Sequence, residues 1–258
     1  MEPENDPNST AAPPPINAVI VGASGGIGRA LTDALLARDE ARRVFALSRR
    51  FEPPAHPRLT ALEADPTEPR SLARVAGAVA DQVDAVHLLI ICTGVLHGGD
   101  DDPGLAPEKS LADLDGERFR RVMTVNALAP LQTIHAFSPL LRHDHRAVAA
   151  ALSAMVGSIG DNRIGGWYSY RMSKAALNMG LRNAAIELGR GRPSGRPKPI
   201  VAAIHPGTTV TPLSEPFLRR HRARPPEESA AHILAVLDRL TESDSGRFFN
   251  WDGSELPW

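Results

Sequence analysis

From residue 16 onward, short apolar runs alternate with amphipathic stretches. The apolar runs are rich in valine, isoleucine and leucine, which is typical of parallel strands buried on both faces. In the amphipathic stretches apolar residues recur at helical spacing, as Ile27, Leu31 and Leu35 do. The pattern predicts strands near 16–22, 44–47, 59–63, 84–94, 146–154, 199–207 and 246–253. It predicts helices near 23–39, 71–82, 115–143, 167–189 and 226–240.

Strands that alternate with helices predict an α/β fold built on a parallel sheet. Right-handed crossovers then give a single doubly wound Rossmann domain, with about seven parallel strands and helices on both faces. We expect this domain over 16–258, with a mobile substrate lid near 208–224. Residues 1–15 are polar and rich in proline, and we expect them to be a disordered leader. Loops are expected over 95–110 and 190–199.

The composition excludes several classes of protein. The net charge is −1, from 29 basic and 30 acidic residues, so no bulk field recruits nucleic acid or an anionic membrane. No apolar run reaches the roughly 18 residues of a membrane helix, and the leader lacks the apolar centre of a signal peptide. Cys92 is the single cysteine, so neither an internal disulfide nor a cysteine-rich zinc motif can form. We expect a cytoplasmic protein that acts on a small molecule.

A glycine-rich turn, GASGGIG, joins the first expected strand to the first expected helix. Gly22, Gly26 and Gly28 allow a tight turn and close approach to a diphosphate, which the free N–H groups of the helix would bind. Ser24 and Ile27 lie in the same turn and are further candidate contacts to a cofactor. The alternative is a glycine turn with no ligand, but its place after the first strand favours a nucleotide site.

The end of the second expected strand favours NADP(H) over NAD(H). A carboxylate at this position would bind the ribose 2′-hydroxyl of NAD, but the chain has Ser48, Arg49 and Arg50, which suit a 2′-phosphate. The alternative is that the arginines are solvated loop charges. Asp65, just past the third strand, either caps a helix or binds the edge of an adenine.

Tyr170 and Lys174 stand four residues apart on an expected helix, and therefore on one face of it. An ammonium beside a phenol favours the phenolate, so Lys174 is expected to lower the pKa of Tyr170 from its usual value near 10. Such a phenol can exchange a proton near neutral pH. The alternative is an exposed, solvated pair. The other tyrosine, Tyr168, has Met172 at the corresponding position.

Three features occur together: GASGGIG after the first strand, Asn126 on the long middle helix, and YRMSK after the fifth strand. In this order and spacing they resemble the short-chain dehydrogenase/reductase family, over nearly the whole chain from Asn17. The segments GSIGDNRIGGWYSYRMSKAALN and DSGRFFNWDGSELPW look more narrowly like the C-factor-like subgroup, which is similar to carbonyl reductases of the sniffer type.

The resemblance implies a role for each matching residue. Tyr170 would be the general acid/base, and Lys174 would bind the nicotinamide ribose and lower the tyrosine pKa. The glycines of the turn would bind the cofactor diphosphate and Asp65 the adenine. The remaining implied cofactor contacts are Thr93, Gly94, Pro206, Gly207 and Thr209, with Cys92 in place of the family's asparagine.

Asn126 has a physical argument of its own. Pro130 lies four residues further along and has no N–H, so the Asn126 carbonyl loses its normal helical partner. In the family this carbonyl holds a water in a proton relay to the lysine. We expect Pro130 to help create that water site; the alternative is a plain proline kink.

The catalytic serine departs from the family pattern. Counting back from Gly157 places its position at Ala154, with Ser153 one residue earlier and Ser158 after the glycine. Side chains alternate on a strand, so a shift by one residue points Ser153 to the other face unless the strand has ended or bulged. Ser153 is the first candidate to support the substrate oxygen, and Ser158 the second.

Other charged and aromatic residues have simpler interpretations. His135, His143 and His145 form a candidate metal cluster, but no carboxylate completes it and we predict surface histidines and no metal site. Trp167 either lines the substrate cleft or packs at a subunit interface. The four arginines in the expected lid form a basic patch that either favours an anionic substrate or is solvated: Arg219, Arg220, Arg222 and Arg224.

The sequence therefore predicts an NADP(H)-dependent oxidoreductase that transfers a hydride between nicotinamide and a carbonyl or alcohol, as a homodimer or homotetramer. The alternative is a cofactor-binding signalling or regulatory protein of the C-factor type with little catalysis. A structural protein of the same fold that binds no nucleotide is a third possibility. Substrate, reaction direction and oligomer size stay open.

Overall fold

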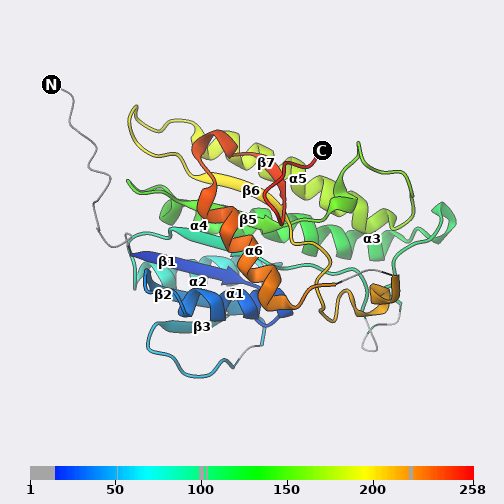
Figure 1. The fold of residues 1–258 in the computed structure, drawn as a ribbon, viewed down its shortest axis with the longest axis horizontal. Helices are drawn as coiled ribbons and strands as arrows, with labels where there is room; N and C mark the ends of the chain where they lie inside the picture. Colours follow the sequence, from blue (N-terminus) through cyan, green and yellow to red (C-terminus); the bar gives the residue numbers. More distant parts are fainter. Residues whose placement is uncertain (1–14, 51, 99–101, 103, 221–222) are drawn as a thin grey trace.

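A computed structural model describes residues 15–50, 52–98, 102, 104–220 and 223–258. Its centre is a seven-stranded sheet in the order β3-β2-β1-β4-β5-β6-β7, and every neighbouring pair is parallel (Figure 1). The strands are β1 (Ile16–Val21), β2 (Ala41–Ser48), β3 (Leu59–Glu63), β4 (Leu88–Ile91), β5 (Val148–Leu152), β6 (Ile200–His205) and β7 (Arg247–Asn250). The predicted doubly wound fold is confirmed.

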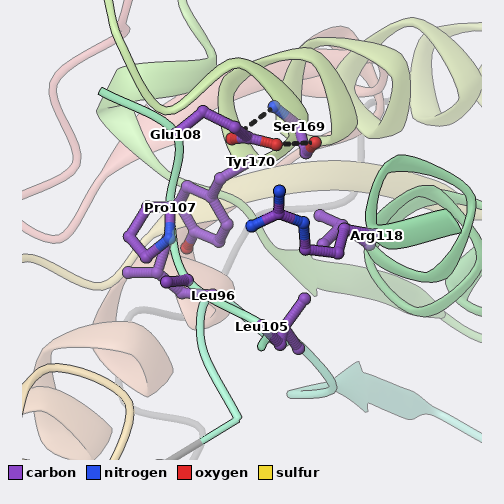
Figure 2. Close-up of a pocket in the computed structure, with 9 residues that line it drawn as sticks. Leu96, Leu105, Pro107, Glu108, Arg118, Ser169 and Tyr170 are labelled. Carbon is purple, nitrogen blue, oxygen red and sulfur yellow. Dashed lines mark hydrogen bonds between the residues drawn. The ribbon is translucent and has the colours of Figure 1, made fainter. Parts of the chain in front are cut away.

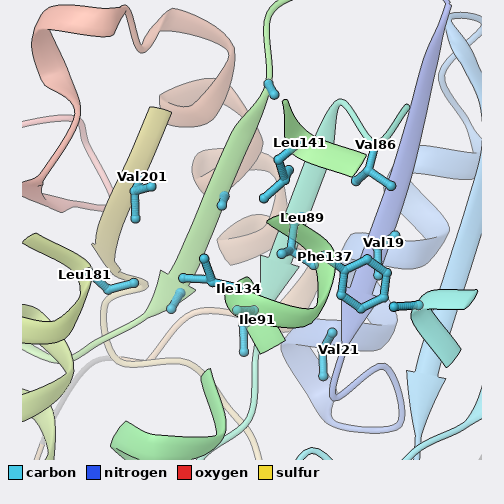
Figure 3. Close-up of a cluster of buried hydrophobic side chains, with 14 of the residues drawn as sticks. Val19, Val21, Val86, Leu89, Ile91, Ile134, Phe137, Leu141, Leu181 and Val201 are labelled. Atoms are coloured by element: carbon cyan, nitrogen blue, oxygen red, sulfur yellow. The ribbon is translucent and has the colours of Figure 1, made fainter. Parts of the chain in front are cut away.

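Helices cover both faces of the sheet because successive strand residues point to opposite sides. On one face Ala18 and Ile20 pack with α1 (Gly26–Leu36) and α6 (Pro226–Arg239). On the other, Val19 and its neighbours pack with three helices: α2 (Pro69–Ala80), α4 (Ala129–Leu141) and α5 (Tyr168–Gly189). Figure 3 shows this second core, where Phe137 and Ile134 of α4 lie over the strands. Packing on these faces fixes the positions of α1 and α5.

The long helix predicted over 115–143 is present over 116–141, with one irregular turn in its middle. The structure has α3 (Gly116–Met123), a π-helical turn η3 (Thr124–Leu128) and then α4. Within the turn the backbone N–H of Ala129 reaches the Thr124 carbonyl, five residues back. Pro130 has no N–H to give to Asn126, so regular α-helical pairing cannot pass this point. The π-helical turn contains Asn126, the residue whose carbonyl Pro130 leaves without its α-helical partner.

The carboxyl ends of the strands form the edge where chemistry-bearing residues gather. The strand order reverses at β1, which lies between β2 and β4, and ligands of doubly wound sheets bind at such a switch point. The glycine turn follows β1, Cys92 follows β4, Ser153 follows β5 and Pro206 follows β6. The segments after these four strands therefore meet at one edge.

Several expected segments fall wholly or partly outside the described residues. The predicted leader does so up to residue 14, as do residues 99–101 and 103 of the loop over 95–110 and residues 221–222 of the expected lid. The rest of the expected lid contains a short helix, η5 (Glu215–Arg220). The segment 190–199 is irregular, as predicted. Within the described ranges, no helix is both long and apolar enough to cross a bilayer.

Candidate active site

The turn after β1 requires glycine at two positions. Gly22 has φ +85°, and a Cβ there would lie 3.1 Å from the Thr93 backbone nitrogen. A Cβ on Gly28 would lie 2.2 Å from the Gly22 carbonyl oxygen. Both contacts are to backbone that cannot move aside, so the glycines let the start of α1 pack directly against the ends of β1 and β4.

The N-terminus of α1 has the features of an anion site. Its N-cap residue, Gly25, contributes no side chain, and the first turn contains no acidic residue. The first N–H groups of a helix have no partner within the helix and carry a partial positive charge. Nearby, the buried Thr93 hydroxyl has no hydrogen-bond partner in the part of the chain that the structure describes. A bound diphosphate would satisfy such donors, so these residues fit a dinucleotide.

The edge beyond β2 brings together the residues expected at the adenosine end. The Ser48 hydroxyl donates to the Ser24 hydroxyl at 2.8 Å, which ties the end of β2 to the glycine turn. Arg49 is exposed and helps to lower the pKa of Asp65. Partial burial acts to raise the pKa of that carboxyl, but the hydrogen bonds from Thr67 and the charge of Arg49 together lower it. Because Asp65 Oδ1 accepts from both the N–H and the hydroxyl of Thr67, it orders the turn before α2.

Tyr170 and Lys174 are both buried at the start of α5, so they are not the exposed pair of the alternative interpretation. Lys174 Nζ lies 5.7 Å from the centre of the Tyr170 ring and donates to the Leu152 carbonyl at 2.8 Å. Burial lowers the pKa of Lys174 to about 8 and raises the pKa of Tyr170 to about 12. The expected lowering of the tyrosine pKa is therefore absent here, because desolvation of the phenol dominates.

Asn126 connects the π-turn to the strand ends. Its Oδ1 accepts from the Val95 N–H at 2.7 Å, and its Nδ2 donates to the Val95 carbonyl at 2.8 Å and to the Ser173 hydroxyl at 3.0 Å. A Cβ on Gly94 would lie 3.6 Å from Lys174 Nζ and 3.7 Å from Asn126 Oδ1. Gly94 thus lies where these two side chains meet. The water predicted at the Asn126 carbonyl stays a prediction.

A pocket opens beside Tyr170 (Figure 2). Its walls combine apolar side chains with Glu108, Ser169 and Arg118. The apolar lining residues are Leu96, Leu105, Ala106, Pro107 and Val122. The pocket therefore places Tyr170 beside both apolar side chains and the charged groups of Glu108 and Arg118.

These features correspond to one known family. A model of the short chain dehydrogenase family matches residues 17–221. The protein belongs to this family. As a short-chain dehydrogenase it is an oxidoreductase, and the resemblance found in its sequence is confirmed.

Relatives of the chain include proteins of different named activities. This short-chain dehydrogenase is 40% identical over 148 residues to the 1-hydroxy-2-glutathionyl-2-methyl-3-butene dehydrogenase of Rhodococcus sp. strain AD45, in an alignment that covers 57% of this chain and 62% of that protein. It is 38% identical over 149 residues to the C-signal protein of Myxococcus xanthus, covering 58% of this chain and 84% of that protein.

Solved structures agree on the fold. The NADPH-bound carbonyl reductase from chicken fatty liver aligns with a TM-score of 0.81 at 27% identity, over 95% of this chain and 100% of that one. The carbonyl reductase Sniffer of D. melanogaster aligns with a TM-score of 0.80 at 21% identity over the same shares, which shows the shared fold. The similarities to C-signal and to the chicken carbonyl reductase agree with the predicted subgroup.

The short-chain dehydrogenase site differs from the family pattern at the serine. The Ser153 hydroxyl donates to Asn178 Oδ1 on α5 at 2.6 Å, and Lys174 stands one turn before Asn178. Ser153 thus faces α5, as strand alternation predicts. The Ser158 hydroxyl donates to the Trp258 carbonyl at 3.2 Å. Both hydroxyl protons have acceptors, which weighs against the predicted oxyanion role of either serine, and Ala154 carries no hydroxyl.

The two ends of the segment 208–224 are hydrogen-bonded to each other, and we call these paired ends its base. The backbone of Thr208 and Val210 pairs with that of Arg224, and the Thr209 hydroxyl contacts the Ser229 hydroxyl of α6 at 2.8 Å. The Arg224 guanidinium stacks 3.6 Å from the centre of the Trp251 ring. A Cβ on Gly207 (φ +74°) would lie 2.8 Å from Arg224 and 3.0 Å from Trp251. These contacts fix Gly207 and the residues that follow it.

Sequence reasoning missed contacts between distant segments. Glu108 is buried against Ser169 of α5, and no sequence motif marks it. His143 and His145 gather around His87 rather than His135, with ring centres 4.8 and 6.0 Å from that of His87. Burial, with the two neighbouring rings, lowers the pKa of His87 to about 4. Among the residues described, no group of three or more candidate ligands is arranged to hold a metal.

Proposed function

We propose that this protein is an NADP(H)-dependent carbonyl reductase in which Tyr170 is the general acid. The observation that carries the proposal is a buried Tyr170 that lines a pocket, with Lys174 one turn along the same helix and Gly94 between Lys174 and Asn126. A buried phenol with a neighbouring ammonium is suited to proton transfer at a carbonyl oxygen. The family membership and the NADPH-bound carbonyl reductase of similar fold support the same chemistry.

The cofactor would lie along the carboxyl edge of the sheet. Gly22, Gly26 and Gly28, with Ser24 and Ile27, would hold the diphosphate, and Ser48 with Arg49 would bind the 2′-phosphate. Asp65 would border the adenine. The residues proposed at the nicotinamide end are Thr93, Gly94, Tyr170, Lys174, Pro206, Gly207 and Thr209. When bound, NADPH supplies the hydride that reduces the carbonyl carbon.

The chain's own residues would manage the proton and the developing charge. Tyr170 would give its proton to the carbonyl oxygen as that oxygen gains negative charge. Lys174 would stabilise the resulting tyrosinate, because its ammonium is close and poorly solvated. Asn126 would hold the loop at Val95 and, through its backbone carbonyl, a water that returns a proton toward Lys174. The segment 208–224 would act as the substrate lid.

The test is NADPH oxidation across a panel of aldehydes and ketones, with one matched pair of variants. Tyr170→Phe is expected to lower kcat by about 10²- to 10⁴-fold, the usual worth of a positioned acid. Its Kd for NADPH, measured by fluorescence, should stay near that of the parent protein. Tyr168→Phe removes the only other tyrosine hydroxyl and should leave turnover intact. Full activity in Tyr170→Phe would refute the proposed acid.

A regulatory role is the second candidate function. The similarity to the Myxococcus C-signal protein and the alanine at position 154 favour it. Tight NADPH binding without turnover of any carbonyl in the panel would support this alternative. The absence of NADPH binding as well would support a purely structural role.

We further propose that the protein works as a homodimer or homotetramer in the cytoplasm. Met172, Met179 and Ile186 are exposed at seven-residue intervals along α5, so they form an apolar stripe on one side of that helix. Such a stripe suits contact with a second copy. Sedimentation analysis tests this, and Met179→Glu should shift any oligomer toward monomer. The single, poorly ionised thiol of Cys92 is compatible with a reducing compartment.

A further inference from the structure

The helix that carries Tyr170 begins without a cap from its own sequence. Its N-cap residue, Trp167, makes no side-chain capping bond and has φ 51°, the only positive φ of a non-glycine residue in the described part of the chain. The first N–H groups of a helix need acceptors, and a left-handed backbone at a bulky residue persists only where surrounding contacts hold it. The start of α5 therefore depends on a partner from elsewhere.

Glu108 is that partner, 61 residues earlier in the chain. Its carboxylate accepts a hydrogen bond from the Ser169 N–H at 3.1 Å and another from the Ser169 hydroxyl (Figure 2). Its backbone carbonyl accepts from the Trp167 N–H at 2.5 Å. Glu108 is only 3% exposed. A carboxylate at the positive end of a helix dipole is favourable, and both of its oxygens are used.

We propose that Glu108 is a positioning residue for Tyr170. Ser169, which Glu108 holds, directly precedes Tyr170, and Glu108 and Tyr170 line the same pocket. The kinetic part of this inference rests on the proposed reductase function. By fixing the first turn of α5, Glu108 sets where the phenol stands relative to a substrate oxygen.

Trp167 connects the start of α5 to the segment 208–224. Its ring meets the Tyr170 ring edge-on at 6.2 Å and packs against Phe217 at 4.9 Å. The Glu108 carbonyl anchors the Trp167 backbone, so Glu108 also supports the contact between the start of α5 and the segment 208–224. We call the hydrogen bonds of Glu108 to Ser169 and Trp167 the clamp. Misplacing a reacting group by about 1 Å can lower a rate about 10²-fold, so loss of the clamp should lower kcat more than it weakens cofactor binding.

Two substitutions separate the hydrogen bonds of Glu108 from its charge. In Glu108→Gln the amide oxygen can accept the Ser169 N–H, while the amide N–H donates to the Ser169 hydroxyl, so the clamp survives without charge. Glu108→Ala removes both side-chain bonds. We expect Glu108→Ala to lower kcat by about 10- to 100-fold with an NADPH Kd within about twofold, and Glu108→Gln to stay within about threefold of the parent.

Asp244→Ala is the matched control. Asp244 accepts from the N–H and the hydroxyl of Thr241, the same pair of donors that Ser169 offers Glu108, but after α6. The Asp244→Ala variant should lose unfolding free energy, as Glu108→Ala does, but should keep the kcat of the parent protein. If Glu108→Ala keeps its kcat, or if Asp244→Ala loses kcat equally, Glu108 does not position Tyr170.

Amide hydrogen exchange over residues 166–173 tests the clamp without any turnover. Glu108→Ala should exchange faster there, whereas Asp244→Ala and Glu108→Gln should match the parent. Faster exchange in a protein that reduces no carbonyl would refute the reductase and retain the clamp. Unchanged exchange would refute the clamp, whatever the activity.

Discussion

Lys174 donates its Nζ proton to the Leu152 carbonyl, at the last residue of β5, rather than to the Tyr170 hydroxyl in the same helix. The bond joins α5 to the carboxyl end of β5. It holds the ammonium near the phenol ring, at 5.7 Å from its centre. In the proposed mechanism Lys174 stabilises the tyrosinate through its charge, so the protonation state of Lys174 should affect the rate.

The pH dependence of carbonyl reduction should show this. Burial lowers the pKa of Lys174 to about 8, so the ammonium is present below that pH and lost above it. Because the positive charge favours the tyrosinate left after proton donation, we expect kcat to fall as pH rises through about 8. The pH profile of NADPH oxidation measures this. In Lys174→Met the remaining activity should lack this limb, and a limb that persists there would assign it to another group.

Replacing Ser153 tests whether any serine supports the substrate oxygen. The Ser153 hydroxyl donates to Asn178 Oδ1, so we expect Ser153→Ala to keep most of its kcat and to lose about 1 kcal/mol of unfolding free energy, the usual contribution of one buried hydrogen bond. Activity and urea unfolding are the two measurements. A loss of 10²- to 10³-fold in kcat, as for a missing oxyanion donor, would restore Ser153 as a catalytic residue.

Arg49 should determine the choice between the two nicotinamide cofactors. A charge-assisted bond to phosphate contributes about 1.5–3 kcal/mol, so Arg49→Ala is expected to weaken NADPH binding by roughly tenfold or more and to leave NADH binding unchanged. Titration of both cofactors by fluorescence measures the ratio of their affinities. Arg42→Ala removes an exposed arginine from the other end of β2 and controls for net charge. An equal loss for both cofactors would argue against a 2′-phosphate contact.

Gly28 should tolerate no side chain. Gly28→Ala places a Cβ 2.2 Å from the Gly22 carbonyl, so the turn must open, and we expect loss of NADPH binding with a fall in Tm of several degrees. Gly77 is the control, because it lies in α2 with no atom within 4 Å of an added Cβ. Gly77→Ala should stabilise by about 0.5–1 kcal/mol, since alanine favours a helix. Equal behaviour of the two variants in thermal unfolding would refute the steric argument.

Acid should destabilise the fold through the histidines at the amino end of β4 and β5. The pKa of His87 is about 4 when folded, against about 6.5 when unfolded, and that of the neighbouring His143 is also lowered by burial. As pH falls below 6.5 the unfolded chain binds protons that the folded one excludes, so stability is lost through pH 4. Asp144 and Arg192 also act on His143, in opposite directions.

For His87 we expect a loss of about 1 kcal/mol between pH 7 and pH 5, reduced from the full linkage value because solvent reaches part of the ring. Urea unfolding at both pH values measures it. His87→Gln should show a smaller loss, and His135→Gln, at an exposed position on α4, should match the parent. A similar pH dependence in all three proteins would assign acid destabilisation to other groups.

Local sequence patterns predicted most of the fold. The apolar runs of β1 and β5 and the helical stripe of α1 mark elements whose burial depends on spacing alone, and Pro130 marked the interruption at Asn126. The direction of the Tyr170 pKa was wrong because burial is a property of the whole fold. No local sequence pattern could predict the contact of Glu108, because its partner Ser169 lies 61 residues further along the chain. The orientation of Ser153 followed from strand alternation, but Asn178 as its acceptor did not.

The segment 208–224 consists of a base that is bonded to the rest of the fold and a stretch that extends from this base. Thr209 and Arg224 belong to the base, which is attached to α6 and to Trp251, while residues 212–220 extend beyond it. If this segment is the substrate lid, changes among residues 215–220 should alter the choice of substrate and leave Gly207, which lies against Arg224 and Trp251, undisturbed. Exchange of one short peptide would then change the substrate, while the residues proposed to bind the cofactor stay the same.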